Sequence, residues 1–136
     1  MLEIRAFPKA LSSELDMLDI IPKGLRNCTN LRACTWTRDG SLNSDILRAL
    51  QTSGSLRELE INGHDDGNYD PDLLKGFANL TRISLIMPSG SVIAQLKSWM
   101  ELTGNTLKAL TLICKVNFPS YLRCYHNTCM TRHRRW

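Results

Sequence analysis

The sequence predicts an α/β fold in which about four parallel strands alternate with helices. Three observations support this prediction: a phrase that occurs four times, a nearly constant spacing between its copies, and an amphipathic segment in each interval. The four copies are NLRACTW, SLRELEI, NLTRISL and TLKALTL, at residues 30–36, 55–61, 79–85 and 106–112. Each copy has the pattern polar–Leu–x–x–apolar–x–apolar, whose alternation is typical of a strand with one buried face.

The spacing of the copies indicates the type of repeat. The lead leucines are Leu31, Leu56, Leu80 and Leu107, so successive repeats are 25, 24 and 27 residues long. Periods of about 20–29 residues with an L-x-x-L-x-L core are typical of a leucine-rich repeat. A repeat of this kind cannot bury its apolar face alone and needs neighbours on both sides. We therefore predict a right-handed leucine-rich-repeat solenoid with the parallel sheet on its concave face.

The first segment predicts a short strand followed by a long helix. Leu2 and Ile4 have the alternation of a truncated strand. The apolar residues that follow are spaced by four, three, three and four positions, which is typical of a helix with one buried face. These residues are Leu11, Leu15, Leu18, Ile21 and Leu25.

The second segment predicts a helix with recognisable ends. After Trp36, either Asn43 or Ser44 can cap the start of the helix, and Gly54 can end it. Its predicted inward face consists of Ile46, Leu47 and Leu50.

The third and fourth segments each predict one more helix. Asp70 before Pro71 is the sequence of an N-cap followed by a first helical residue. The inward residues of that helix are Leu73, Leu74 and Phe77. In the fourth segment Ser91 is the predicted cap and Gly104 follows the helix end. The apolar stripe between them consists of Val92, Ile93, Leu96, Trp99 and Met100.

Alternation along the strands separates core residues from residues that are free to contact a partner. Leu31, Cys34 and Trp36, together with their equivalents in the other copies, are predicted to face the core. The residues between them have no packing role, so their chemistry can serve binding. We predict a partner-binding concave row that consists of Thr35, Glu58, Glu60, Arg82, Ser84 and Thr111.

Composition favours a folded intracellular protein. The 136 residues are 43% hydrophobic and 22% charged, which is ordinary for one soluble domain. No apolar run approaches the roughly 18 residues of a membrane span, and the first residues lack the pattern of a secretory signal. Five cysteines without a framework spacing predict reduced, small core residues at Cys28, Cys34 and Cys114. We expect a cytoplasmic or nuclear location, away from membranes.

Charge divides the chain into two parts. Residues 1–114 hold 12 Lys and Arg against 13 Asp and Glu, whereas residues 115–136 hold five Lys and Arg and no acid. The second part also has no apolar periodicity. We therefore predict a leucine-rich-repeat domain at 1–114 and a basic, irregular tail at 115–136.

The basic tail provides an alternative function. Arg132, Arg134 and Arg135, with Tyr121 and Tyr125 upstream, could contact nucleic acid or an anionic surface by charge and stacking. A short solubilising end is the simpler interpretation, so nucleic acid is not the partner that we expect.

The ends of the repeat region predict whether further repeats or other copies of the chain cover them. No polar capping repeat precedes Leu2, and solenoids need capped ends for solubility. We expect the domain to be part of a longer array, and the isolated chain to self-associate through its uncapped ends.

No residue pattern typical of catalysis occurs. The sequence has no G-x-S-x-G, glycine-rich phosphate loop or H-E-x-x-H, and we predict that the protein is not an enzyme and needs no cofactor. Residues 66–70 have the D-x-N-x-D spacing that opens a calcium loop. Pro71 and Phe77 then replace the glycine and the bidentate glutamate that such a loop requires, so we interpret it as an acidic turn with a helix cap.

The tail contains a second candidate metal site. Its four residues have the spacing C-x-H-x2-C-x3-H and could hold a tetrahedral zinc ion. This spacing matches no standard zinc finger, so we predict no metal. The four candidate ligands are Cys124, His126, Cys129 and His133.

The segments that join a helix to the next strand resemble those of fungal F-box/leucine-rich-repeat-type proteins. These segments are GLRNCTNLRACTW, ALQTSGSLRELEINGH and the later GFANLTRISL. The resemblance covers about residues 1–114. In that family an F-box docks a cullin-RING ubiquitin ligase and the repeats select substrates. No F-box-like segment is visible in this sequence, so the resemblance implies only the substrate-recognition role of a ligase adaptor. We therefore predict a non-enzymatic protein–protein interaction module.

The turns after the strands depart from the commonest form of this repeat. The position that usually holds an asparagine or cysteine is occupied by Asp39, His64, Pro88 and Lys115 in the four copies. We therefore expect irregular turns.

Overall fold

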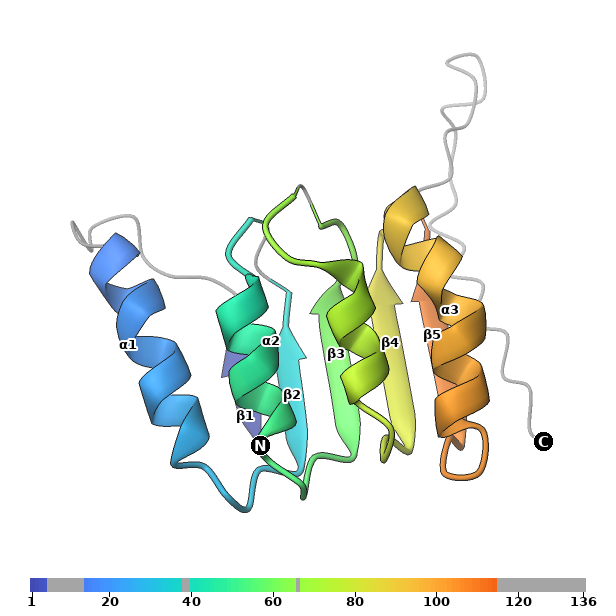
Figure 1. Cartoon of the computed structure of the whole chain (residues 1–136), viewed down its shortest axis with the longest axis horizontal. Helices are drawn as coiled ribbons and strands as arrows, with labels where there is room; N and C mark the ends of the chain where they lie inside the picture. Colours follow the sequence, from blue (N-terminus) through green and yellow to red (C-terminus); the bar gives the residue numbers. More distant parts are fainter. Residues whose placement is uncertain (5–13, 38–39, 66, 115–136) are drawn as a thin grey trace, which may run out of the picture.

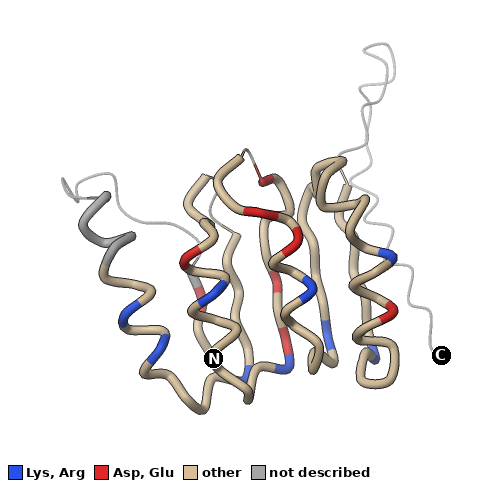
Figure 2. The backbone as a smooth tube through the Cα atoms, in the orientation of Figure 1, with Lys and Arg blue, Asp and Glu red and all other residues tan. Residues whose placement is uncertain are grey.

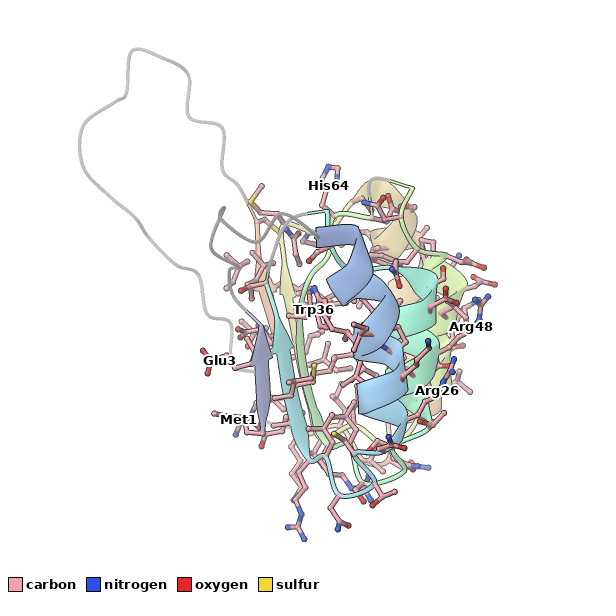
Figure 3. The ribbon with its side chains drawn as sticks, turned by 90° about the vertical axis from the view of Figure 1, so that its left-hand side faces the viewer. Met1, Glu3, Arg26, Trp36, Arg48 and His64 are labelled. Carbon is pink, nitrogen blue, oxygen red and sulfur yellow. The ribbon has the colours of Figure 1, made fainter. Side chains whose placement is uncertain are left out.

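The computed structural model of this chain describes residues 1–4, 14–37, 40–65 and 67–114. Within these ranges the chain forms two layers (Figure 1). One layer is a five-stranded sheet, and the other contains three α-helices and one 3-10 helix. The described helices all lie against the same face of the sheet (Figure 3).

The strands lie side by side in chain order, and every neighbouring pair is parallel. They are β1 (Leu2–Ile4), β2 (Ala33–Trp36), β3 (Glu58–Asn62), β4 (Arg82–Ile86) and β5 (Ala109–Ile113). The four repeated phrases therefore form β2 to β5, and the truncated strand that Leu2 and Ile4 predict is β1. A parallel α/β fold with alternating strands and helices is confirmed.

Where their side chains are described, the first two helices have the predicted inward faces. α1 (Glu14–Arg26) and α2 (Ser44–Gln51) pack side by side. Leu25 of α1 is buried and Ile21 is half-buried, whereas Leu11 and the side chains of Leu15 and Leu18 lie outside what the structure describes. All three residues predicted to face inward from α2 are buried.

The ends of α2 show one success and one error of the sequence rules. Asn43 is the N-cap, and its Oδ1 accepts a hydrogen bond from the Ile46 N–H at 2.9 Å. This contact supplies a partner for one of the backbone donors that a helix start leaves unpaired. Gly54 does not cap the other end. The helix stops at Gln51, and Thr52 occupies the C-cap, where its hydroxyl donates to the Ala49 carbonyl at 2.7 Å.

The third predicted helix is a 3-10 helix, η1 (Pro71–Gly76). Asp70 caps it as predicted, because its carboxylate accepts a hydrogen bond from the Asp72 N–H at 2.9 Å. Leu74 and Phe77 are buried and Leu73 is half-buried. The segment has only six residues, and 3-10 helices occur as short pieces of this kind rather than as long elements.

The fourth helix, α3 (Gly90–Thr103), corrects two predictions. Its N-cap is Ser89, and Ser91 lies in the first turn, where its hydroxyl donates to the Asp65 carboxylate. Ile93 is 43% exposed, so the buried stripe is narrower than predicted. Val92 and Trp99 form its fully buried part.

The core lies between the sheet and the helices. Trp36 of β2 and Trp99 of α3 are fully buried, and each indole N–H finds an acceptor. Trp36 Nε1 donates to Ser41 Oγ at 2.9 Å, and Trp99 Nε1 donates to the Phe77 carbonyl at 3.4 Å. Burial of Leu31 and Cys34 confirms the predicted core face of the first repeated phrase.

Candidate interaction surface

The sheet face opposite the helices is the candidate site, and we call it the open face. In the view of Figure 3 the described helices lie on one side of the strands, so no described element covers the other side. Successive side chains of a strand point to opposite faces. In β2 the buried Cys34 and Trp36 alternate with the half-buried Ala33 and Thr35, which places the latter two on the open face.

The strand register aligns the open-face residues into two rows. Adjacent parallel strands lie about 4.8 Å apart, so neighbours within a row can contact one another and a common partner. The first row runs across all five strands and consists of Glu3, Thr35, Glu60, Ser84 and Thr111. The second row consists of Ala33, Glu58, Arg82 and Ala109. All six residues that the sequence selects for partner binding therefore fall in two adjacent rows of one face.

The charged centre of the open face lies on β3 and β4. Arg82 Nη1 is 3.4 Å from Glu58 Oε2 on the neighbouring strand. Both side chains are well exposed, and an ion pair of this kind contributes at most about 1 kcal/mol to stability. Glu60 is half-buried and forms no ion pair with a described residue. The centre therefore carries two carboxylates and one guanidinium, with one carboxylate uncompensated.

Short side chains surround this charged centre. In these two rows alanine and threonine occupy the positions of β2 and β5, and the buried Ser84 lies beside Glu60 on β4. The long side chains of Glu58, Glu60 and Arg82 thus have room to adjust to a partner. The chemistry of these side chains is hydrogen bonding and ion pairing.

A third row completes the open face; strand alternation predicts that its residues point outward, but the predicted partner-binding row does not include them. The third row consists of Asn62, Ile86 and Ile113 at the ends of β3, β4 and β5. Asn62 is buried, and its Oδ1 accepts a hydrogen bond from the His64 N–H at 3.0 Å. Asn62 therefore shapes the turn after β3. His64, at the position that usually holds an asparagine or cysteine in this repeat, is exposed.

The loop after β3 contains two residues with shifted pKa values. A hydrogen bond from Ser91 is the main cause that lowers the pKa of Asp65, and the Gly67 N–H and Ser89 add to it. Tyr69 is buried, and its hydroxyl has no hydrogen-bond partner among the described residues. Burial raises the pKa of Tyr69, and the charge of Asp65 acts in the same direction.

The loop after β3 contains the predicted helix cap. Asp70 caps η1, and Asp65 accepts hydrogen bonds from the turn and from α3, so the acidic turn with a helix cap is present. In the described part of the chain no three His, Cys, Asp or Glu residues gather in a way that could hold a metal ion. Asp66 and the four candidate zinc ligands lie outside that part.

Two of the three cysteines predicted to lie in the core are exposed. Cys34 is a buried core residue as predicted, and burial raises the pKa of its thiol to about 12. Cys28 and Cys114 are exposed, because one lies in the turn after α1 and the other follows the end of β5. All three are free thiols.

Comparison with protein-family models, curated proteins and solved structures found no match. No helix in the described ranges is long and apolar enough to cross a membrane. The structure establishes a parallel α/β fold with helices on one face of the sheet and rows of polar and apolar side chains on the other.

Proposed function

We propose that this chain is a non-enzymatic protein-interaction module that binds a protein partner through the open face. The observation that carries the proposal is the alignment of polar and charged side chains in two rows across consecutive strands. These residues lie on the face opposite the core, so they are not needed to fill it. Rigid strands position them, which reduces the ordering cost when a partner binds.

We further propose that the strand–helix units are turns of a right-handed leucine-rich-repeat solenoid. Two observations support this architecture. Each repeated phrase supplies one strand, and the strands are neighbours in chain order. The helices also contact one another only in sequence, α1 with α2, α2 with η1 and η1 with α3, as far as the chain is described. Contacts limited to neighbouring repeats are typical of solenoids.

The charges of the open face indicate the chemistry of the partner. Glu60 is uncompensated and lies between Thr35 and Ser84 in its row. A lysine, an arginine or a row of amide donors on the partner would complement this carboxylate and the adjacent hydroxyls. The resemblance to fungal F-box/leucine-rich-repeat-type proteins extends the proposal to substrate-recognition repeats of a ubiquitin ligase adaptor.

Affinity capture with the full chain tests the proposal. The test variant is Glu58→Lys with Glu60→Lys, which reverses the charge of the open face. The matched control is Asp45→Lys with Glu101→Lys, which makes the same charge change on the helix layer, where both residues are exposed. Proteins captured by the parent chain and the control, but lost with the test variant, are quantified by mass spectrometry. Equal capture by all three chains would contradict the proposal.

A second candidate function is binding of nucleic acid or an anionic surface by the tail. It is favoured by the charge of residues 115–136, which hold five Lys and Arg and no acid. Deletion of this segment from the full chain separates the two candidates. Loss of partner capture on tail deletion, with no effect of the charge reversal at Glu58 and Glu60, would favour the tail.

A further inference from the structure

Strands β2 to β5 each begin at a cation. Arg32, Arg57 and Lys108 immediately precede β2, β3 and β5, and Arg82 is the first residue of β4. All four residues are exposed. Figure 2 shows Lys and Arg positions gathered at the end of the sheet where these strands start. We call Arg32, Arg57, Arg82 and Lys108 the amino-edge cations.

Backbone hydrogen bonds hold these residues in register. The Arg57 N–H donates to the Arg32 carbonyl at 2.8 Å, and the Lys108 N–H donates to the Thr81 carbonyl at 2.8 Å. The Thr81 N–H in turn donates to the Arg57 carbonyl at 2.7 Å, so Arg32, Arg57, Thr81 and Lys108 occupy equivalent places. Arg82 lies one residue further along β4, in register with Glu58 and Ala109. With about 4.8 Å between strands, Arg32 and Lys108 are roughly 14 Å apart along the edge.

The positive charge of this edge is largely uncompensated. Glu58 lies close to Arg82, as described above, but Arg32 and Lys108 form no ion pair within the described ranges. Arg57 Nη1 donates to the carbonyls of Gly54 and Leu56, each at 2.9 Å, which positions the guanidinium without neutralising it. The four cations and one carboxylate leave a formal charge of +3.

At the opposite end of the sheet, where the strands end, the acidic side chains have partners within the chain. There Asp45 pairs with Arg48 at 3.4 Å, Asp72 pairs with Lys75 at 3.0 Å, and Asp70 caps η1. Figure 2 shows Asp and Glu positions on the side where β3 ends. Cations near helix C-termini also stabilise the helix dipole, which explains Arg57 beside the end of α2. Arg32 and Lys108 follow the ends of α1 and α3 in the same way, and this role leaves their exposed charges free to bind a partner.

We propose that the amino-edge cations bind an acidic, extended segment of a partner protein. An edge of roughly 14 Å matches about four residues of an extended peptide. Arginine suits carboxylates because its guanidinium can donate two parallel hydrogen bonds. This surface goes beyond the proposed function, since Arg32, Arg57 and Lys108 lie outside the rows of the open face.

The burial of the described aromatic side chains favours a peptide over nucleic acid as the ligand of this edge. Single-stranded nucleic acids bind by stacking their bases on exposed aromatic side chains next to a basic groove. Every aromatic residue that the structure describes is buried, so the edge offers no such platform. These residues are Trp36, Tyr69, Phe77 and Trp99.

The test uses the full chain and an oligoglutamate peptide that carries a photoreactive cross-linker and a fluorophore. The edge variant is Arg32→Gln with Lys108→Gln. The control is Arg48→Gln with Lys97→Gln, which removes the same charge from exposed sites of the helix layer. We expect the edge variant to weaken peptide binding at least about fivefold at low salt, and the control to have little effect. Cross-links in the parent chain should map to segments 26–32, 54–58 and 106–109.

Three outcomes would overturn the proposal. Cross-links confined to residues 115–136 would assign binding to the tail. Equal weakening by the edge and control variants would show that only net charge matters. An oligothymidylate of equal charge that binds more tightly and cross-links to the same edge would assign the edge to nucleic acid. None of these measurements uses the open-face partner. A negative result for the amino-edge cations would therefore not contradict the proposed function, which the affinity capture tests separately.

Discussion

Two leucines that are neighbours in the sheet should differ greatly in their contribution to stability. Leu85 of β4 and Leu112 of β5 are paired in the parallel register, in the row of side chains that faces the helices. Leu85 is fully buried between its neighbours in that row, Ile61 and Leu112. Leu112 is 36% exposed, because no described strand lies beyond β5.

The expected magnitudes follow from this difference in burial. Leu85→Ala removes buried methyl groups and leaves a closed cavity, which costs about 2–5 kcal/mol of unfolding free energy. Full burial of a leucine side chain is worth about 1.5–3 kcal/mol, and Leu112 is only partly buried and borders solvent. We therefore expect Leu112→Ala to cost about 1 kcal/mol. The same substitution in one row should thus differ by at least roughly 1 kcal/mol.

Urea unfolding followed by tryptophan fluorescence measures both variants, since Trp36 and Trp99 are buried in the core. The comparison requires the same m-value for both, so that the midpoint shift reports stability alone. Equal costs for the two substitutions would refute the reasoning. They would show that another element or another copy of the chain covers β5 in the folded protein, and light scattering across a concentration series would tell which of the two it is.

Three further predictions concern local contacts. Asn43→Ala should lower the unfolding free energy by about 1 kcal/mol in urea titrations, and Ser89→Ala by clearly less, because only Asn43 makes a capping hydrogen bond; equal losses would contradict this. Cys34, with its pKa raised to about 12, should resist alkylation at neutral pH while the exposed thiols react, which mass spectrometry of the folded chain checks. Ser91→Ala should raise the pKa of Asp65 in an NMR titration. The stability that the lowered pKa provides is present above the unfolded value and lost as pH falls through the folded value, so the variant should lose stability at neutral pH and little at acidic pH.

The strands and two of the caps could be predicted because they depend on local patterns. The lead leucine and alternating apolar residues set the strand positions, and Asn43 and Asp70 cap helices within their own segments. The start of α3 could not be predicted in this way. Two serines stand two residues apart there, and the hydrogen bond of Ser91 goes to Asp65, which lies 26 residues earlier. A tertiary contact of that kind leaves no local signal.

The open face was predictable, whereas the amino edge was not. Period-two alternation assigns Thr35 or Glu60 to the face opposite the core without knowledge of the neighbouring strands. The amino-edge cations occur once per repeat, at the boundary of a strand, within a region whose total charge is near zero. Only the register shows that Arg32, Arg57 and Lys108 line one edge while most of the acids lie elsewhere.

Glu58 connects the two surfaces. It belongs to the second row of the open face, and its carboxylate lies beside Arg82, one of the amino-edge cations. An acidic segment at the edge would compete with Glu58 for Arg82, and would thereby release this carboxylate for a cation of a partner on the open face. Because the Glu58–Arg82 pair is exposed and weak, exchanging it for contacts with a partner costs little. A partner with a basic patch next to an acidic segment would therefore complement both surfaces at once.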